Sequence, residues 1–66
     1  MEITLNGEPR ALESGTTIAI LLDAAGLGGR RVAVELNGEI VPRGRHAEQG
    51  LRPGDRVEIV HALGGG

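Results

Sequence analysis

The last three residues of this 66-residue chain, Gly64, Gly65 and Gly66, are the ones best suited to take part in a reaction. A terminal carboxylate is ionised at neutral pH, so it can attack the α-phosphate of ATP when an enzyme holds the phosphates and stabilises the developing charge. The acyl-adenylate formed in this way is open to a sulfur, nitrogen or oxygen nucleophile. Glycines, which lack a Cβ, can pass through a narrow cleft to reach such an enzyme. We therefore interpret the glycine tail as a substrate whose catalyst is another protein.

An inert end is the alternative interpretation of these glycines, either as a remnant of cloning or as a disordered terminus. A cloning remnant would normally bring serine, lysine or histidine, and the closing residues ALGGG contain none of them. Three glycines beyond the last predicted strand have little to pack against, so we expect the tail to be mobile in the free protein. The sequence thus divides into a folded domain, residues 1–61, and a flexible tail, residues 62–66.

Composition narrows the kinds of partner that the chain can have. Seven arginines and nine acidic residues give a net charge of −2, and lysine, cysteine and aromatic residues are absent. Without a basic cluster or rings that stack on bases, we expect no nucleic-acid partner. Without a long apolar run or a secretory leader, we expect no membrane association and a cytoplasmic location. The only histidines, His46 and His61, have no cysteine partner, so we expect no metal site.

Five short segments follow the two-residue period of strands that bury one face. They cover residues 2–6, 9–13, 32–36, 39–41 and 56–61. Asn6-Gly7 and Asn37-Gly38 are typical of tight hairpin turns. Pro9 has no N–H for a ladder hydrogen bond, so it indicates a sheet edge for the second strand. We therefore predict a sheet of four to five strands.

One amphipathic helix is predicted over residues 17–25. The segment Ser14-Gly15-Thr16 offers a hydroxyl as N-cap, and Gly26 suits the left-handed position that follows a helix. Apolar residues recur at i, i+3, i+4 and i+7, namely at Ile18, Leu21, Leu22 and Ala25. The helix should pack on the sheet face that carries Ile3, Leu5, Val34, Val57 and Ile59. A single sheet with one helix across it is an α+β fold.

The apolar residues next to the tail are candidates for contact with a partner. Val60, Ala62 and Leu63 fall off the predicted core face or beyond the last strand, which leaves apolar area exposed. Exposed apolar patches commonly mark interaction sites. We predict that these three residues, followed by Gly64 and Gly65, form the docking surface that presents the terminus to an activating enzyme.

Several segments of the sequence form a pattern when they are taken together, namely Asn6-Gly7-Glu8, Thr16-Thr17-Ile18 with Leu21-Leu22, the run VAVELNGEIVPR from Val32 to Arg43, Gly54 to Val60, and the closing Gly65-Gly66. Together these segments resemble the ThiS family of sulfur carriers in thiamine biosynthesis. The most specific of these are the VAVELNGEIVPR run and the glycine ending at this total length. The resemblance implies a β-grasp, ubiquitin-like fold in which the first and last strands are central parallel neighbours.

The resemblance also implies a function. A ThiF-like adenylyltransferase would activate the carboxylate of Gly66 with ATP and magnesium, and sulfur from a cysteine desulfurase or another donor would convert it to a thiocarboxylate. A ThiG-like thiazole synthase would then take that sulfur into the thiazole ring of thiamine. Gly66 would be the reactive terminus, Gly65 the required penultimate residue, and Gly64 a compatible extra glycine. The chain itself would bind no cofactor, act as a co-substrate rather than an enzyme, and be monomeric when free.

Other functions share parts of this pattern. A MoaD-like small subunit of molybdopterin synthase and a sulfur carrier for tRNA thiolation have the same fold and ending, although the short length and the VAVELNGEIVPR run disfavour the MoaD-like protein. A ubiquitin-like modifier would form amide bonds to other proteins, and the absence of lysine excludes only self-conjugation through isopeptide bonds. A β-grasp binding module with an inert tail is the remaining alternative. Leu63 stands where the family often has an aromatic residue.

Overall fold

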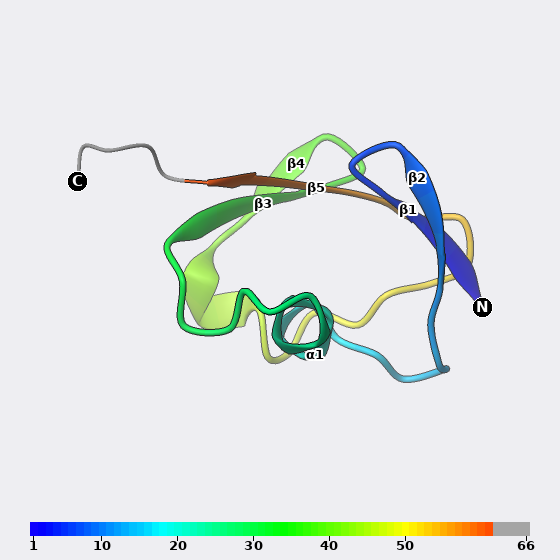
Figure 1. The fold of residues 1–66 in the computed structure, drawn as a ribbon, viewed down its shortest axis with the longest axis horizontal. Coiled ribbons are helices and arrows are strands. Elements are labelled where there is room, and N and C mark those ends of the chain that lie inside the picture. The colour runs from blue at the N-terminus through cyan, green and yellow to red at the C-terminus, as the bar shows by residue number, and fades with distance from the viewer. Residues whose placement is uncertain (62–66) are drawn as a thin grey trace.

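The computed structural model describes residues 1–61, which form one mixed sheet with a helix across one face (Figure 1). The strands are β1 (Glu2–Leu5), β2 (Glu8–Ala11), β3 (Val32–Leu36), β4 (Glu39–Val41) and β5 (Arg56–His61). The helix α1 (Ile18–Ala24) connects β2 to β3, and a short 3₁₀ turn, η1 (Arg43–Arg45), follows β4. Residues 62–66 lie outside this description. The mobility that we expect of the tail therefore stays a prediction.

The strands are arranged in the order β2-β1-β5-β3-β4. The two central strands, β1 and β5, run parallel with Thr4 opposite Arg56, and all other neighbours are antiparallel. Pro9 lies in the edge strand β2, where its missing N–H breaks no ladder. The parallel central pair, the sheet edge predicted from Pro9 and the α+β class are all confirmed. The fold is a ubiquitin-like β-grasp.

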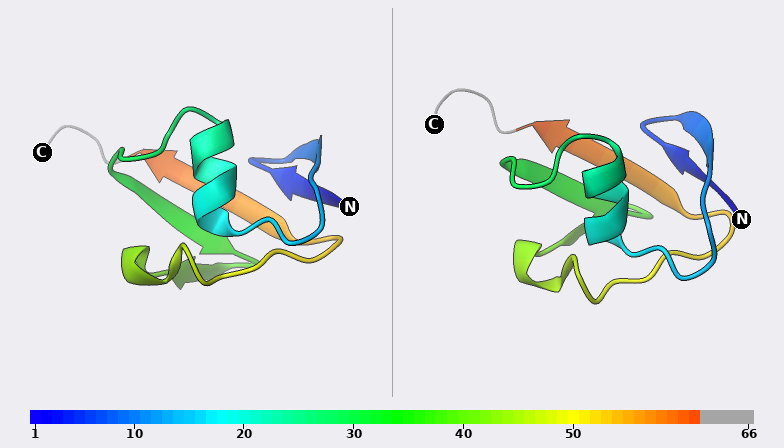
Figure 2. Two further views of the ribbon diagram at one scale, coloured as in Figure 1. Left: turned by 90° about the horizontal axis from the view of Figure 1, so that it is seen from below. Right: turned by 60° about the horizontal axis from the view of Figure 1, so that its bottom comes forward.

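The core lies between α1 and one face of the sheet (Figure 2). Alternation along the strands turns every second side chain toward the helix, because successive Cβ atoms point to opposite faces of a sheet. Nine apolar residues are buried there, namely Ile3, Ile18, Leu21, Leu22, Val34, Val41, Leu51, Val57 and Ile59. Leu5 is only partly buried and packs against this cluster. The helix therefore covers the face expected from the sequence.

The hairpin between β3 and β4 shows why its sequence predicts a tight turn. Asn37 and Gly38 have φ of 52° and 89°, so both central residues are left-handed, as a type I′ turn requires. Asparagine and glycine tolerate this region better than other residues do. The two flanking strands have the bounds that the sequence predicts, 32–36 and 39–41.

Several local expectations differ from the structure. Strand β1 ends at Leu5 rather than at residue 6, and α1 covers Ile18–Ala24 rather than 17–25, because residues 17 and 25 are its caps. Strand β2 covers Glu8–Ala11 rather than 9–13, because only these four residues pair with β1. The helix cap is Thr17, whose side chain accepts the N–H of Ile20 at 3.2 Å, while the Thr16 hydroxyl instead donates to the Glu13 carbonyl at 2.7 Å. Thr17 is three residues before Ile20, which is the spacing of an N-cap bond. The segment after β4, which the sequence suggests to be irregular, contains the short turn η1. Its residues show no apolar periodicity that could have predicted this turn.

Asn6 connects the two central strands, and its loss should weaken the fold. Its side-chain Oδ1 accepts the N–H of Ile59 at 2.8 Å, and its φ is 52°. Asn6→Ala leaves that partly buried N–H without its acceptor and places alanine in a left-handed conformation. We expect the free energy of unfolding to fall by about 2 to 3 kcal/mol, measured by urea unfolding followed by far-UV circular dichroism.

Asn6→Gly separates the two causes, because glycine adopts the same φ without strain but also lacks the acceptor. We expect it to lose about 1 to 2 kcal/mol, less than the alanine variant. Unchanged stability in both variants would show that the hydrogen bond to Ile59 contributes nothing.

Candidate functional site

The candidate site is the end of β5, from which the chain continues toward its glycines. At this end His61 lies opposite Val32 of β3, one strand position beyond the pair formed by Val60 and Ala33. Strand β5 pairs with β1 at its first two residues and with β3 from Val57 to His61, so a neighbouring strand holds its backbone up to its end. His61, the last residue that the structure describes, is therefore the end of a central strand of the sheet.

The outer face of the sheet, opposite α1, carries the exposed apolar residue that the sequence analysis singled out. Val60 is 57% exposed and lies opposite Ala33, which is also exposed. Glu35 of β3 lies nearby on the same face. It is opposite Glu58 of β5 and also opposite Ile40 of β4, whose side chain is 62% exposed. The surface beside the end of β5 thus combines apolar side chains with two carboxylates. Such a surface suits a partner that offers apolar and basic groups.

Of the predicted site residues, the structure describes only Val60. It lies off the core face, as expected, because the alternation of β5 buries its neighbour Ile59 toward the helix. His61 is exposed at the end of the same strand. The other predicted site residues lie outside the described part of the chain, namely Ala62, Leu63, Gly64, Gly65 and Gly66. Their roles stay predictions.

Sequence reasoning missed one buried polar residue, His46. Its side chain is only 7% exposed, and Nε2 lies 3.0 Å from the carbonyl oxygen of Val41. The residue follows η1 in a segment that the sequence suggests to be polar and irregular, so no apolar period indicates burial. Within residues 1–61 no three histidine, aspartate or glutamate side chains gather as a metal site would require. None of the helices in this range has the length and apolar character to span a bilayer.

A five-stranded mixed sheet with one helix across it and an exposed apolar patch at the end of the last strand define a small β-grasp protein. The model of the ThiS family matches residues 3–66, which is nearly the whole sequence. The chain belongs to the ThiS family. The resemblance noted from its segments is thereby confirmed.

Individual relatives agree with this assignment. The chain is 42% identical to the sulfur carrier protein ThiS of Thermus thermophilus over 64 residues, which cover 97% of this chain and 98% of the relative. It is 46% identical over 66 residues to a thiazole synthase of Magnetococcus marinus, covering 100% of this chain and 20% of that protein. The chain therefore spans about a fifth of the length of the thiazole synthases that it matches.

A solved structure supports the fold at full length. The crystal structure of a thiamine biosynthesis protein (ThiS) from Geobacter metallireducens superposes with a TM-score of 0.86 at 33% sequence identity. The match covers 100% of both chains. The arrangement of strands and helix described above is thus that of a solved ThiS protein.

Proposed function

We propose that this protein is a sulfur carrier of thiamine biosynthesis whose C-terminal carboxylate, on Gly66, carries the sulfur. A ThiF-like adenylyltransferase joins the carboxylate to the α-phosphate of ATP, with magnesium on the phosphates and pyrophosphate as the leaving group. A sulfur nucleophile then attacks the activated carbonyl, AMP departs, and a thiocarboxylate remains. This chain supplies the reacting group and a surface for docking, so it acts as a co-substrate.

The family match up to residue 66 is the single observation that carries this proposal. Because the match includes the glycine ending, the segment in which the sequence analysis found the reactive group belongs to the family pattern. The carrier relative from Thermus thermophilus supports the same function at similar length. The central position of β5 adds a physical reason, since a firmly held strand presents a short segment to an enzyme at a defined place.

A ThiG-like thiazole synthase is the acceptor in this proposal. Proteins named thiazole synthase contain a stretch that is 42 to 46% identical to all 66 residues of this chain. When a carrier segment and its acceptor are parts of one chain, the carrier meets the acceptor at a high effective concentration. This gives a physical reason for joining the two in one protein. The sulfur reaches the carrier from a cysteine desulfurase or a comparable donor, and the proposal places all of these steps in the cytoplasm.

Intact-mass measurement tests the proposal. The full chain is incubated with ATP, magnesium, sulfide and a ThiF-like enzyme, and the expected result is a mass gain equal to replacing one oxygen by sulfur. Because the chain has no cysteine, a thiol-alkylating reagent should label only the charged protein. Omission of ATP is the matched control and should give neither the mass gain nor the label. No gain under conditions that charge an established carrier would contradict the proposal.

Val60 should contribute to recognition by the activating enzyme. Val60→Asp places a charge on the exposed apolar patch without disturbing the core, because the side chain faces away from α1. We expect kcat/KM for adenylation to fall about tenfold, mainly through KM, as measured by pyrophosphate release. The same direction is expected for Leu63→Asp.

Ile20→Asp is the control for this change, since Ile20 is 53% exposed on α1, on the other side of the sheet. Its third helical position tolerates an acid, because negative charge is favourable near a helix N-terminus. We expect adenylation of this variant to equal that of the wild type. A loss of the same size in both variants would place the docking surface elsewhere.

A further inference from the structure

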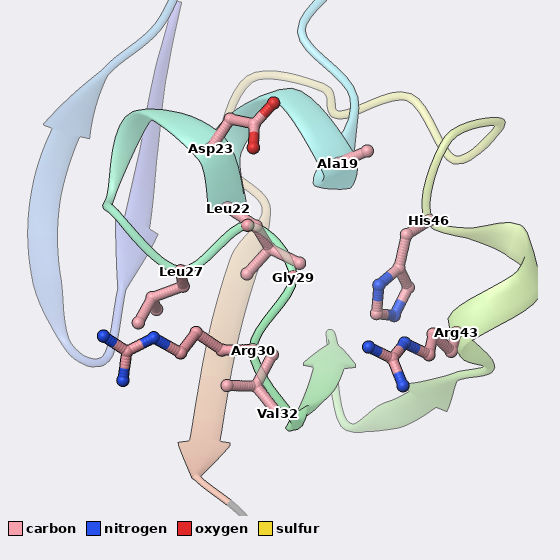
Figure 3. A pocket seen from close by; sticks show the side chains of 10 residues that line it. Ala19, Leu22, Asp23, Leu27, Gly29, Arg30, Val32, Arg43 and His46 are labelled. Carbon is pink, nitrogen blue, oxygen red and sulfur yellow. The ribbon is translucent and has the colours of Figure 1, made fainter.

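A small pocket lies on the helix side of the sheet, between the end of α1, the loop that follows it, the start of β3 and η1 (Figure 3). Its volume is about 180 Å³, and Leu22, Leu27 and Val32 form its apolar part. Basic side chains from segments distant in sequence, Arg30 and Arg43, line it together with His46. The function proposed above makes no use of these residues.

The ring of His46 has one nitrogen bound and one available. A carbonyl oxygen only accepts, so Nε2 must donate to the oxygen of Val41, 3.0 Å away. Nδ1 has no hydrogen-bond partner within residues 1–61. Every fully buried side-chain nitrogen and oxygen in this range does have a partner, so Nδ1 is not fully buried. Nδ1 therefore opens onto the solvent of the pocket, although the residue as a whole is only 7% exposed.

The charges around the pocket favour an anion. The side chain of Arg43 points toward the imidazole of His46, whereas Arg30 extends along the opposite wall, with its guanidinium next to Leu27 and directed away from His46 (Figure 3). Asp23 is the one acidic side chain that lines the pocket, so the lining carries an excess of positive charge in a protein whose net charge is −2. Arginine offers a planar fork of donors that matches an oxyanion.

The loop after α1 also carries backbone N–H groups without a partner in residues 1–61, and the carboxylate of Asp23 lies against this loop at Gly28. The loop after α1 turns through a hydrogen bond from the Arg30 N–H to the Leu27 carbonyl at 3.0 Å. The N–H groups of the two central residues, Gly28 and Gly29, have no hydrogen bond within residues 1–61. Free backbone N–H groups beside cationic side chains are typical components of anion sites.

We propose that this pocket binds a single oxyanion, held by the Arg43 guanidinium, with the ring of His46 beside it and Arg30 on the opposite wall. Pockets for drug-sized ligands span about 300 to 1,000 Å³, so a pocket of about 180 Å³ suits one carboxylate or one tetrahedral oxyanion rather than a nucleotide. The site faces the helix side of the sheet, away from Val60. It is thus separate from the patch proposed for docking.

Titration of the ¹⁵N-labelled full chain followed by NMR tests the proposal. Sodium sulfate and sodium acetate serve as probes, because both stay ionised from pH 6 to 8, and sodium chloride at equal ionic strength is the reference. We expect saturable shifts at the amides of Gly29, Arg30 and His46 that chloride does not cause. Saturation with sulfate alone assigns a tetrahedral oxyanion, and saturation with acetate alone assigns a carboxylate.

Two arginine variants make the test specific. Arg43→Gln should weaken the binding of the saturating probe about fivefold or more, because it removes the guanidinium beside His46. Arg45→Gln, from the same turn η1 but outside this pocket, should change the affinity for that probe by less than about twofold. Shifts no larger than those with chloride, or equal weakening in both variants, would overturn the proposal.

Discussion

Deleting Gly65 and Gly66 together will abolish sulfur loading, with an expected loss of at least about a hundredfold in the rate of thiocarboxylate formation. The deletion draws the terminal carboxylate back by about 7 Å, and a reacting group displaced that far cannot reach the α-phosphate. It also leaves Leu63 next to the last residue. The measurement is the intact-mass gain described above, followed over time for both chains.

Gly64→Ala is the matched control, because it keeps the length of the tail and the last two glycines. We expect its loading rate to stay within about threefold of the wild type, since only one Cβ is added.

Removing a single glycine answers a different question. Whichever of the three is deleted, the product ends in ALGG, so this variant changes only the reach of the tail. Normal loading of the chain without Gly65 and Gly66 would show that the reaction does not depend on the last two glycines.

Leu21→Ala will unfold the protein under conditions in which the wild type is folded. Leu21 is fully buried at the centre of the helix–sheet contact. Truncating a buried leucine costs about 2 to 5 kcal/mol, and a domain of this size has a total stability of only about 3 to 5 kcal/mol. We therefore expect loss of the cooperative thermal transition by far-UV circular dichroism and collapse of the amide dispersion in NMR spectra.

The adjacent residue provides the control for this prediction. Ile20→Ala removes a similar side chain from the same helix, but Ile20 is 53% exposed. We expect its unfolding free energy to differ from that of the wild type by no more than about 0.5 kcal/mol. A cooperative transition in Leu21→Ala close to that of the wild type would mean that the sheet holds together without the helix contact.

Local chemistry explains why most of the fold is predictable from this sequence. Strands β3, β4 and β5 have the predicted bounds because strong signals flank them, Asn37-Gly38 between the first two and Pro53-Gly54 before the last. The predicted second strand starts one residue too late and extends too far, because the sequence after it contains no breaker before Ser14. Pairing with the short strand β1 sets its actual length.

The candidate sites were predictable to different degrees. Val60 could be placed on the outer face because the two-residue period of β5 dictates it. The basic pocket could not be predicted, since Arg30, Arg43 and His46 come from polar segments without a period and meet only in the folded chain. The reactive role proposed for Gly66 rests on the chemistry of a terminal carboxylate and on family membership, and the residue lies outside the described structure.

The parallel pairing of β1 and β5 offers a practical route to oriented attachment on a solid support. Counting from the pair Thr4 and Arg56, Met1 and His61 are separated by about 26 Å along the strand direction. Because lysine is absent, the α-amino group of Met1 is the only primary amine. Its hydrogen bond to the Leu12 carbonyl needs one N–H, which an amide linkage retains. Amine coupling would therefore anchor every molecule at the same end and leave the end of β5 facing the solution.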